Sequence, residues 1–127
     1  MRISVVIPAL NEAGNIGRLV TETYAAVPAE TLGEVIVVDD ASEDMTGNEI
    51  KDLIAAGTCQ GLRYLRHSVR SGQSTAMRTG ILAACFPVIA TMDGDGQNDP
   101  RDIPRLLEKL DPPGAKGVAL VGGVRTD

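Results

Sequence analysis

Aromatic residues are scarce in this sequence, which has no tryptophan, one phenylalanine and two tyrosines among 127 residues. Because hydrophobic residues still make up 43% of the chain, its core must be built from valine, isoleucine, leucine and alanine. A chain of this length can bury such a core as one small domain. We therefore expect residues 1–127 to form a single domain with an aliphatic interior.

Cysteines, basic residues and long apolar runs are also limited. The two cysteines, Cys59 and Cys85, show neither metal-ligand spacing nor a disulfide framework, which is typical of a reducing compartment. A total of 12 basic against 17 acidic residues gives a net charge of -5, which disfavours a nucleic-acid backbone as partner. No run approaches the roughly 18 apolar residues that span a membrane. We expect a cytoplasmic protein with no nucleic-acid partner.

Short apolar runs rich in β-branched residues alternate with segments of helical periodicity. The runs predict strands over residues 3–7, 35–38, 62–66, 88–92 and 118–121. The segments between them place apolar residues three and four positions apart, as amphipathic helices do. This alternation predicts a three-layer α/β/α fold with a mainly parallel sheet.

Three of the helices carry signals at their ends. Asn11 is a candidate cap for the first helix, which should end before Pro28. Thr46 followed by Glu49 predicts a capping box at the start of the second, and Gly57 marks its exit. The third should begin near Gly72 and turn Met77, Ile81, Ala84 and Cys85 to one face.

The polar residues of interest gather in four loops that follow the predicted strands. These loops cover residues 8–12, 39–42, 67–74 and 93–99. In open parallel sheets, ligands bind beyond the carboxyl ends of the strands, near the point where the strand order reverses. The sequence therefore predicts a binding site formed by these four loops.

The last of these loops is acidic and interrupted by glycines. If the strand before it continues, Asp93 and Asp95 project to the same side and repel each other unless a cation lies between them. Gln97 adds a neutral oxygen, and Gly94 allows close approach of a ligand. Hard oxygen donors suit Mg²⁺ or Mn²⁺. The alternative is a solvated turn without a ligand, because Asp and Gly are ordinary turn residues.

A cluster of carboxylates at one edge of the sheet needs compensation. The sequence brings four of them to the predicted site: Asp39, Asp40, Asp93 and Asp95. A divalent metal with a bound phosphate would supply that compensation, and three arginines are candidate phosphate partners: Arg66, Arg70 and Arg78. The single histidine, His67, is expected to be a surface residue rather than a catalyst. The aspartates at the second strand end have a structural alternative, as turn caps.

Four segments of the sequence together resemble family 2 glycosyltransferases, and most closely the dolichyl-phosphate mannosyltransferase-like branch. They are Ser4–Glu12, Val37–Ser42, Ser71–Ala76 and Asp93–Pro100, in this order. The resemblance implies a GT-A fold and an inverting transfer of a sugar from a UDP- or GDP-linked donor. The implied acceptor is a lipid phosphate, polyprenyl or dolichyl, or a glycan. A lipid acceptor would place the protein at the cytoplasmic face of the membrane.

The resemblance also implies roles for individual residues. The implied nucleotide-sugar site comprises Pro8, Ala9, Asn11, Glu12, Asp39, Asp40, Gly72, Asp93, Gly94 and Asp95. Within it, Asp40, with Asp39 beside it, would meet the base and ribose. The implied metal ligands are Asp93, Asp95 and Gln97. No general base is assigned, because a lipid phosphate is already anionic near neutral pH, whereas a sugar hydroxyl would require a carboxylate base.

Two other functions stay open from the sequence. One is a nucleotide-sugar-binding module without transfer activity, because family members continue past this sequence into an acceptor segment. The other is a receiver-type signalling domain, which is disfavoured because the acidic pair ends the second strand rather than the first. We also expect self-association, since a GT-A sheet that stops at its fifth strand exposes an edge.

Overall fold

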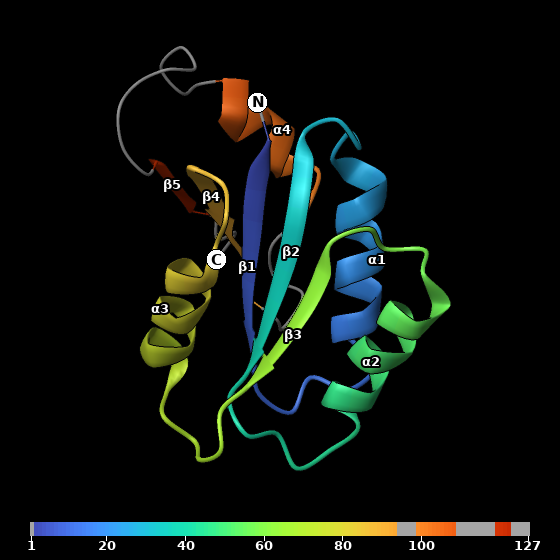
Figure 1. The fold of residues 1–127 in the computed structure, drawn as a ribbon, viewed down its shortest axis with the longest axis vertical. Helices are drawn as coiled ribbons and strands as arrows, with labels where there is room; N and C mark the ends of the chain where they lie inside the picture. Colours follow the sequence, from blue (N-terminus) through green and yellow to red (C-terminus); the bar gives the residue numbers. More distant parts are fainter. Residues whose placement is uncertain (1, 94–98, 109–118, 123–127) are drawn as a thin grey trace.

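A computed structural model describes residues 2–93, 99–108 and 119–122 of the chain (Figure 1). Strands and helices alternate through them. The elements are β1 (Ile3–Ala9), α1 (Ile16–Ala26), β2 (Leu32–Asp39), α2 (Thr46–Ala56), β3 (Leu62–Arg66), α3 (Gln73–Ala83), β4 (Val88–Thr91), α4 (Asp102–Glu108) and β5 (Ala119–Gly122). None of the helices in these residues is long and apolar enough to cross a membrane.

The described strands form one sheet in the order β3-β2-β1-β4-β5, and every neighbouring pair is parallel. β1 lies at the centre, between β2 on one side and β4 on the other. The strand order reverses there, because the chain moves outward through β2 and β3 and then returns to β4. The predicted parallel sheet is confirmed, and its switch point lies between β1 and β4.

Helices cover both faces of the sheet, with α3 on one side and α1 and α2 on the other (Figure 1). Alternate residues of β1 supply the two cores: Val5 and Ile7 join the cluster that includes α1 and α2, whereas Val6 joins the cluster under α3. Gly80 brings α3 close to the sheet, since a Cβ atom there would lie 2.3 Å from Cγ1 of Val6. The α/β/α layering expected from the sequence is therefore correct.

β1 is longer than predicted and passes through Pro8 to Ala9. The amide of Met92 donates to the carbonyl of Val6 on the β4 side. Residues two apart turn their backbone groups to the same side, so the missing N–H of Pro8 also falls on that side. The β4 pairing has ended there, and proline therefore costs no ladder hydrogen bond.

Two predicted helix caps are wrong. Asn11 has a positive φ of 52° and lies well before α1, whose N-cap position is taken by Asn15 without a side-chain hydrogen bond. Thr46 lies within α2, and Met45 holds its N-cap position. Only the exit signal is confirmed, because Gly57 caps α2 in the left-handed conformation.

The residues expected to form the capping box make contacts with a distant loop. Thr46 Oγ1 accepts a hydrogen bond from the amide of Glu12 at 2.8 Å. The carboxylate of Glu49 accepts hydrogen bonds from the amides of Gly14 and Gly17, at 2.6 and 3.3 Å. These side chains therefore tie the first turn of α2 to the loop between β1 and α1 and to the first turn of α1.

The predicted face of α3 is correct except at its end. Met77, Ile81 and Ala84 pack against the cluster on this side of the sheet, whereas Cys85 is exposed. The helix ends at Ala83, before Cys85 could join that face.

Candidate functional site

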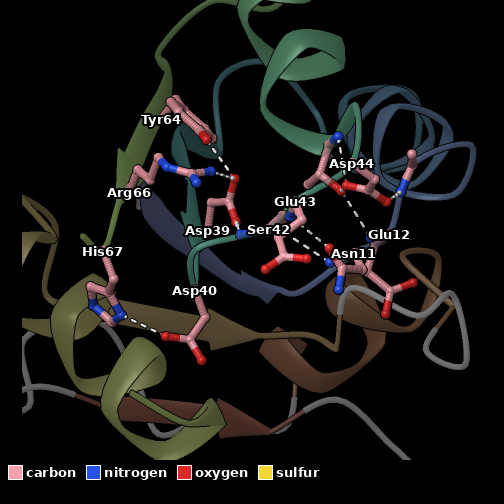
Figure 2. A network of polar contacts seen from close by, with 12 residues as sticks. Asn11, Glu12, Asp39, Asp40, Ser42, Glu43, Asp44, Tyr64, Arg66 and His67 are labelled. Carbon is pink, nitrogen blue, oxygen red and sulfur yellow. Dashed lines mark hydrogen bonds and ion pairs between the residues drawn. The ribbon is translucent and has the colours of Figure 1, made fainter. Parts of the chain in front are cut away.

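The loops after β1 and β2 form one connected unit at the carboxyl edge of the sheet (Figure 2). The amide of Asn11 donates to Ser42 Oγ at 2.9 Å, and Oδ1 of Asn11 accepts from the amide of Glu43 at 2.9 Å. The amide of Asp40 donates to the carbonyl of Ala9 at 2.9 Å. Asn11 thus locks one loop to the other instead of capping a helix.

Asp44 is a second link between these loops that the sequence analysis missed. Its Oδ1 accepts hydrogen bonds from the amide and hydroxyl of Thr46, and its Oδ2 accepts one from the amide of Ala13 at 3.2 Å. Burial would raise the pKa of Asp44, but these hydrogen bonds outweigh it and lower the pKa. The Asp-x-Thr pattern at the start of a helix was the local signal for such a turn.

The adjacent aspartates at the end of β2 face opposite sides of the sheet, as successive strand residues do. Asp39 is fully buried on the α2 side. Its Oδ1 accepts from the amide of Ser42 at 2.8 Å, and its Oδ2 accepts from the hydroxyl of Tyr64 and from Arg66 Nη1 at 3.1 Å (Figure 2). Burial, and then the Asp39 carboxylate, raise the pKa of Tyr64. The charge of Asp39 is therefore compensated within the protein.

Asp40 lies on the α3 side and is also buried. Its Oδ1 accepts hydrogen bonds from His67 Nδ1 at 2.9 Å and from the Ser71 amide at 2.7 Å, and its Oδ2 accepts one from the Gly72 amide at 2.8 Å. Burial would raise the pKa of Asp40, but the hydrogen bonds from His67 and the two amides lower it. This carboxylate anchors the loop that leads into α3.

A cavity of about 310 Å³ opens between these loops, the start of α3 and the end of β4. Its lining residues are Pro8, Ala9, Leu10, Glu12, Asp40, Arg70, Gly72, Gln73, Ala76 and Asp93. The volume is at the lower end of the range for small-molecule sites. Gln73 Nε2 donates to Asp93 Oδ1 at 2.6 Å and so joins α3 to the end of β4. The cavity lies at the switch point, where parallel sheets bind ligands.

The predicted site residues fall into three groups. Those that line the cavity are Pro8, Ala9, Glu12, Asp40, Gly72 and Asp93. Asn11 and Asp39 lie beside it but turn toward the neighbouring loops and strands. Gly94, Asp95 and Gln97 lie outside the described residues. The part of each residue in ligand binding stays a prediction.

The charged partners expected at the site are arranged differently from the prediction. Arg70 lines the cavity, whereas Arg66 pairs with Asp39. His67 is not a surface residue, because only 16% of its side chain is exposed. Gln73, which the sequence analysis did not single out, contacts Asp93. Three acidic residues and one arginine therefore line the cavity among the described residues.

The sequence predicts a metal ion at the loop that begins with Asp93. Within residues 2–93, 99–108 and 119–122, no group of three His, Cys, Asp or Glu side chains is placed to hold a metal ion. Of the three predicted ligands, Asp93 alone is among them; it lines the cavity and has a carboxylate, the hard oxygen donor that such metals prefer.

Comparison with known proteins identifies the family. Residues 4–126 match the family described as Glycosyl transferase family 2. The chain belongs to this family. The receiver-type alternative is therefore wrong.

The family 2 relatives include enzymes named for polyprenyl phosphates. The chain is 38% identical to a dodecaprenyl-phosphate galacturonate synthase from Rhizobium johnstonii, over 87% of this chain and 33% of the relative. It is 35% identical to an undecaprenyl-phosphate 4-deoxy-4-formamido-L-arabinose transferase from an Enterobacter species, over 98% of this chain and 37% of the relative. The chain thus spans about a third of the length of these curated relatives. The predicted branch of family 2 is confirmed.

Solved structures of glycosyltransferases share the fold. The mannosyltransferase PcManGT from Pyrobaculum calidifontis, in complex with GDP-Man and Mn²⁺, has a TM-score of 0.78 and 27% identity, over 88% of this chain and 33% of that one. GalNAc-T7 with UDP, GalNAc and Mn²⁺ has a TM-score of 0.67 at 24% identity, over 74% of this chain and 18% of that one, which shows the fold alone. The predicted GT-A fold is confirmed.

Proposed function

We propose that this chain is the donor-binding part of a glycosyltransferase that moves a sugar from a UDP- or GDP-linked donor to a polyprenyl phosphate. The observation that carries this proposal is the cavity at the switch point, lined by Asp40, which follows β2, and by Asp93, which follows β4. The names of the two family 2 relatives support the acceptor class. The mannosyltransferase complex with GDP-Man and Mn²⁺ supports the donor class.

Asp40, rather than Asp39, is the carboxylate that would meet the nucleoside. Asp39 is fully buried and receives hydrogen bonds on both oxygens from the protein. Asp40 borders the cavity. A ribose hydroxyl or a ring N–H of the base could donate to it there. Of the two aspartates that the family resemblance assigns to the nucleoside, we therefore propose Asp40 alone.

Asp93 fits a metal ligand at the diphosphate. Its carboxylate borders the cavity and is oriented by the side-chain amide of Gln73. Asp95 and Gln97 follow it closely in the sequence and would complete the ligand set. Bound Mg²⁺ or Mn²⁺ would hold the diphosphate and stabilise the charge of the leaving group. The nearby Arg70 would contact a phosphate directly.

The acceptor phosphate would act as its own nucleophile. One of its anionic oxygens would form a bond to the anomeric carbon, while the bond from that carbon to the nucleoside diphosphate breaks. Attack from the opposite side inverts the anomeric configuration and needs no general base. A glycan acceptor would instead need a carboxylate to take up the hydroxyl proton. A polyprenyl acceptor would bring the reaction to the face of a membrane, and the cytoplasmic face is the side we propose.

The transferase is favoured over a binding module, because the relatives are named as synthases and transferases. Self-association through the sheet edge stays a prediction.

Calorimetric titration of UDP and GDP, each with and without MnCl₂, tests the proposed function. We expect one of the two nucleotides to bind the wild type in the presence of Mn²⁺ and to lose most of its affinity in the Asp93→Asn variant. The matched control is Asp52→Asn, which changes an exposed carboxylate on α2. Failure of both nucleotides to bind the wild type, or equal binding without metal, would contradict the proposal.

A further inference from the structure

His67 is held at both ring nitrogens between the cavity wall and α3. Nδ1 lies 2.9 Å from Oδ1 of Asp40, and Nε2 lies 2.8 Å from Oγ1 of Thr79 on α3. Figure 2 shows the ring turned toward Asp40. Although His67 does not line the cavity itself, its ring supports a residue that does.

The contact with Asp40 fixes where His67 carries a proton. An ionised carboxylate only accepts hydrogen bonds, so Nδ1 must be the donor. The hydroxyl of Thr79 can adapt, because it lies 3.0 Å from the carbonyl of Thr75 and 2.8 Å from Nε2. The Thr79 hydroxyl donates to the Thr75 carbonyl when Nε2 of His67 is protonated, and donates to Nε2 when Nε2 is unprotonated. The N–H from His67 to Asp40 is therefore present in both charge states of the ring.

Among the described residues, the hydrogen bonds to Asp40 leave one acceptor position open. Oδ1 accepts two hydrogen bonds, from His67 and from the Ser71 amide, which fill both of its lone pairs. Oδ2 accepts one from these residues, from the Gly72 amide, so one lone pair remains on Oδ2 of Asp40, a residue that lines the cavity. Without His67, the carboxylate would lose one of the two donors on Oδ1 and would be held only by the amides of Ser71 and Gly72 in the loop before α3, so its orientation would be less tightly fixed.

We propose that His67 is a positioning residue for donor binding: its Nδ1–H holds the Asp40 carboxylate so that Oδ2 presents its open acceptor position to the nucleoside. This inference rests on the proposed function of the cavity. The same contact stabilises the loop before α3, in which Arg70 and Gly72 line the cavity, because Asp40 also accepts hydrogen bonds from the amides of Ser71 and Gly72.

The proposal requires a hydrogen-bond donor at the Nδ1 position, not an imidazole that titrates. The side-chain nitrogen of asparagine takes the place of Nδ1 and retains the donor. Alanine removes it. His67→Asn should therefore preserve donor binding, whereas His67→Ala should weaken it. If His67 acted as an acid or base, neither asparagine nor alanine could take over its role.

The experiment combines nucleotide binding with a spectrum of the ring. Calorimetry with UDP and GDP in MnCl₂ should show an about tenfold higher Kd for His67→Ala, the size of a lost hydrogen bond to a charged group. His67→Asn should stay within about threefold of the wild type, as should the control Ser68→Ala at the exposed next residue. Thermal melts establish that each variant is folded. Because the chain has one histidine, ¹⁵N spectra report the His67 ring alone.

The outcomes of these experiments distinguish a failure of the proposal on His67 from a failure of the proposed function. In the wild type we expect a protonated Nδ1 whose signal shifts in Asp40→Asn; an unprotonated Nδ1 would overturn the proposal without reference to any nucleotide. Wild-type binding that His67→Ala leaves unchanged would overturn this inference while the proposed function stands. Equal loss in the Ala and Asn variants would also overturn it, because the imidazole itself would then be required. Failure of the wild type to bind either nucleotide would overturn the proposed function and this inference with it.

Discussion

Two buried carboxylates lie on the α3 side of β2, Glu34 near its start and Asp40 just beyond its end. Both are hydrogen-bonded through both oxygens. The carboxylate of Glu34 accepts hydrogen bonds from Ser4 Oγ at 2.6 Å, from the Cys85 amide at 2.6 Å and from Arg63 Nη1 at 2.9 Å. The carboxylate of Asp40 accepts them from His67 and from two loop amides. In each, burial would raise the pKa and the hydrogen bonds lower it.

The two carboxylates differ in the kind of donor that they bind and in whether their residue lines the cavity. The partners of Glu34 include a full positive charge and tie β1, β3 and the segment after α3 together, away from the residues that line the cavity. Asp40 borders the cavity, and its amide donors belong to the loop that forms part of the wall. The comparison teaches that burial and a lowered pKa do not by themselves mark a functional carboxylate. We expect the open acceptor position at the cavity to be the feature that distinguishes Asp40 from Glu34 in function.

The largest effect is expected from Asp40→Asn. The amide group would turn an N–H toward a backbone amide or toward His67, so donors would face donors at the wall of the cavity. We expect the Kd for the bound nucleotide to rise about 100-fold, as for the loss of hydrogen bonds to a charged group. Calorimetry in MnCl₂ measures this. Binding as tight as in the wild type would remove Asp40 from the site.

Glu34→Gln should lower the stability of the protein and leave nucleotide binding almost unchanged. It breaks an ion pair with Arg63, whose side chain is 39% exposed, so the loss of stability is reduced by solvent screening to about 2 kcal/mol. Urea unfolding measures this change. The nucleotide Kd should stay within about twofold of the wild type, because Glu34 does not border the cavity. A large change in Kd would mean that the two ends of β2 are coupled, and the comparison would fail.

The fold was predictable because its signals are local. A β-branched run such as Val35–Val38 indicates a buried strand wherever it occurs, and its alternation with helical segments implies a parallel sheet. The position of the site followed from that topology, since the ends of parallel strands meet at one edge. The opposite orientation of Asp39 and Asp40 was also available, from the two-residue period of a strand.

The remaining details of the site depend on contacts between residues far apart in the chain. Nothing near Glu49 indicates that its carboxylate binds the amides of Gly14 and Gly17 instead of completing a capping box. Likewise, His67 resembles a surface residue until Thr79 of α3 is brought against its ring. Such partners become known only once the helices are packed on the sheet. Local patterns therefore predicted the edge of the sheet at which the cavity lies, but not which side chains hold its surrounding loops together.

The smallest effect is expected in the pH dependence of stability. Because the pKa values of Glu34 and Asp40 are lowered in the folded state, each contributes stability above its ordinary pKa of about 4, and that contribution is lost as the pH falls through the lowered value. The difference in unfolding free energy between the wild type and Glu34→Gln should therefore narrow by about 1 kcal/mol from pH 6 to pH 3. Val20→Ala is the control, since it destabilises by opening a cavity in the core on the opposite face of the sheet from Glu34 and Asp40, and its difference from the wild type should stay constant. A gap for Glu34→Gln that stays equally constant would show that folding does not lower the pKa of Glu34, and would contradict the prediction that its hydrogen bonds favour the ionised carboxylate.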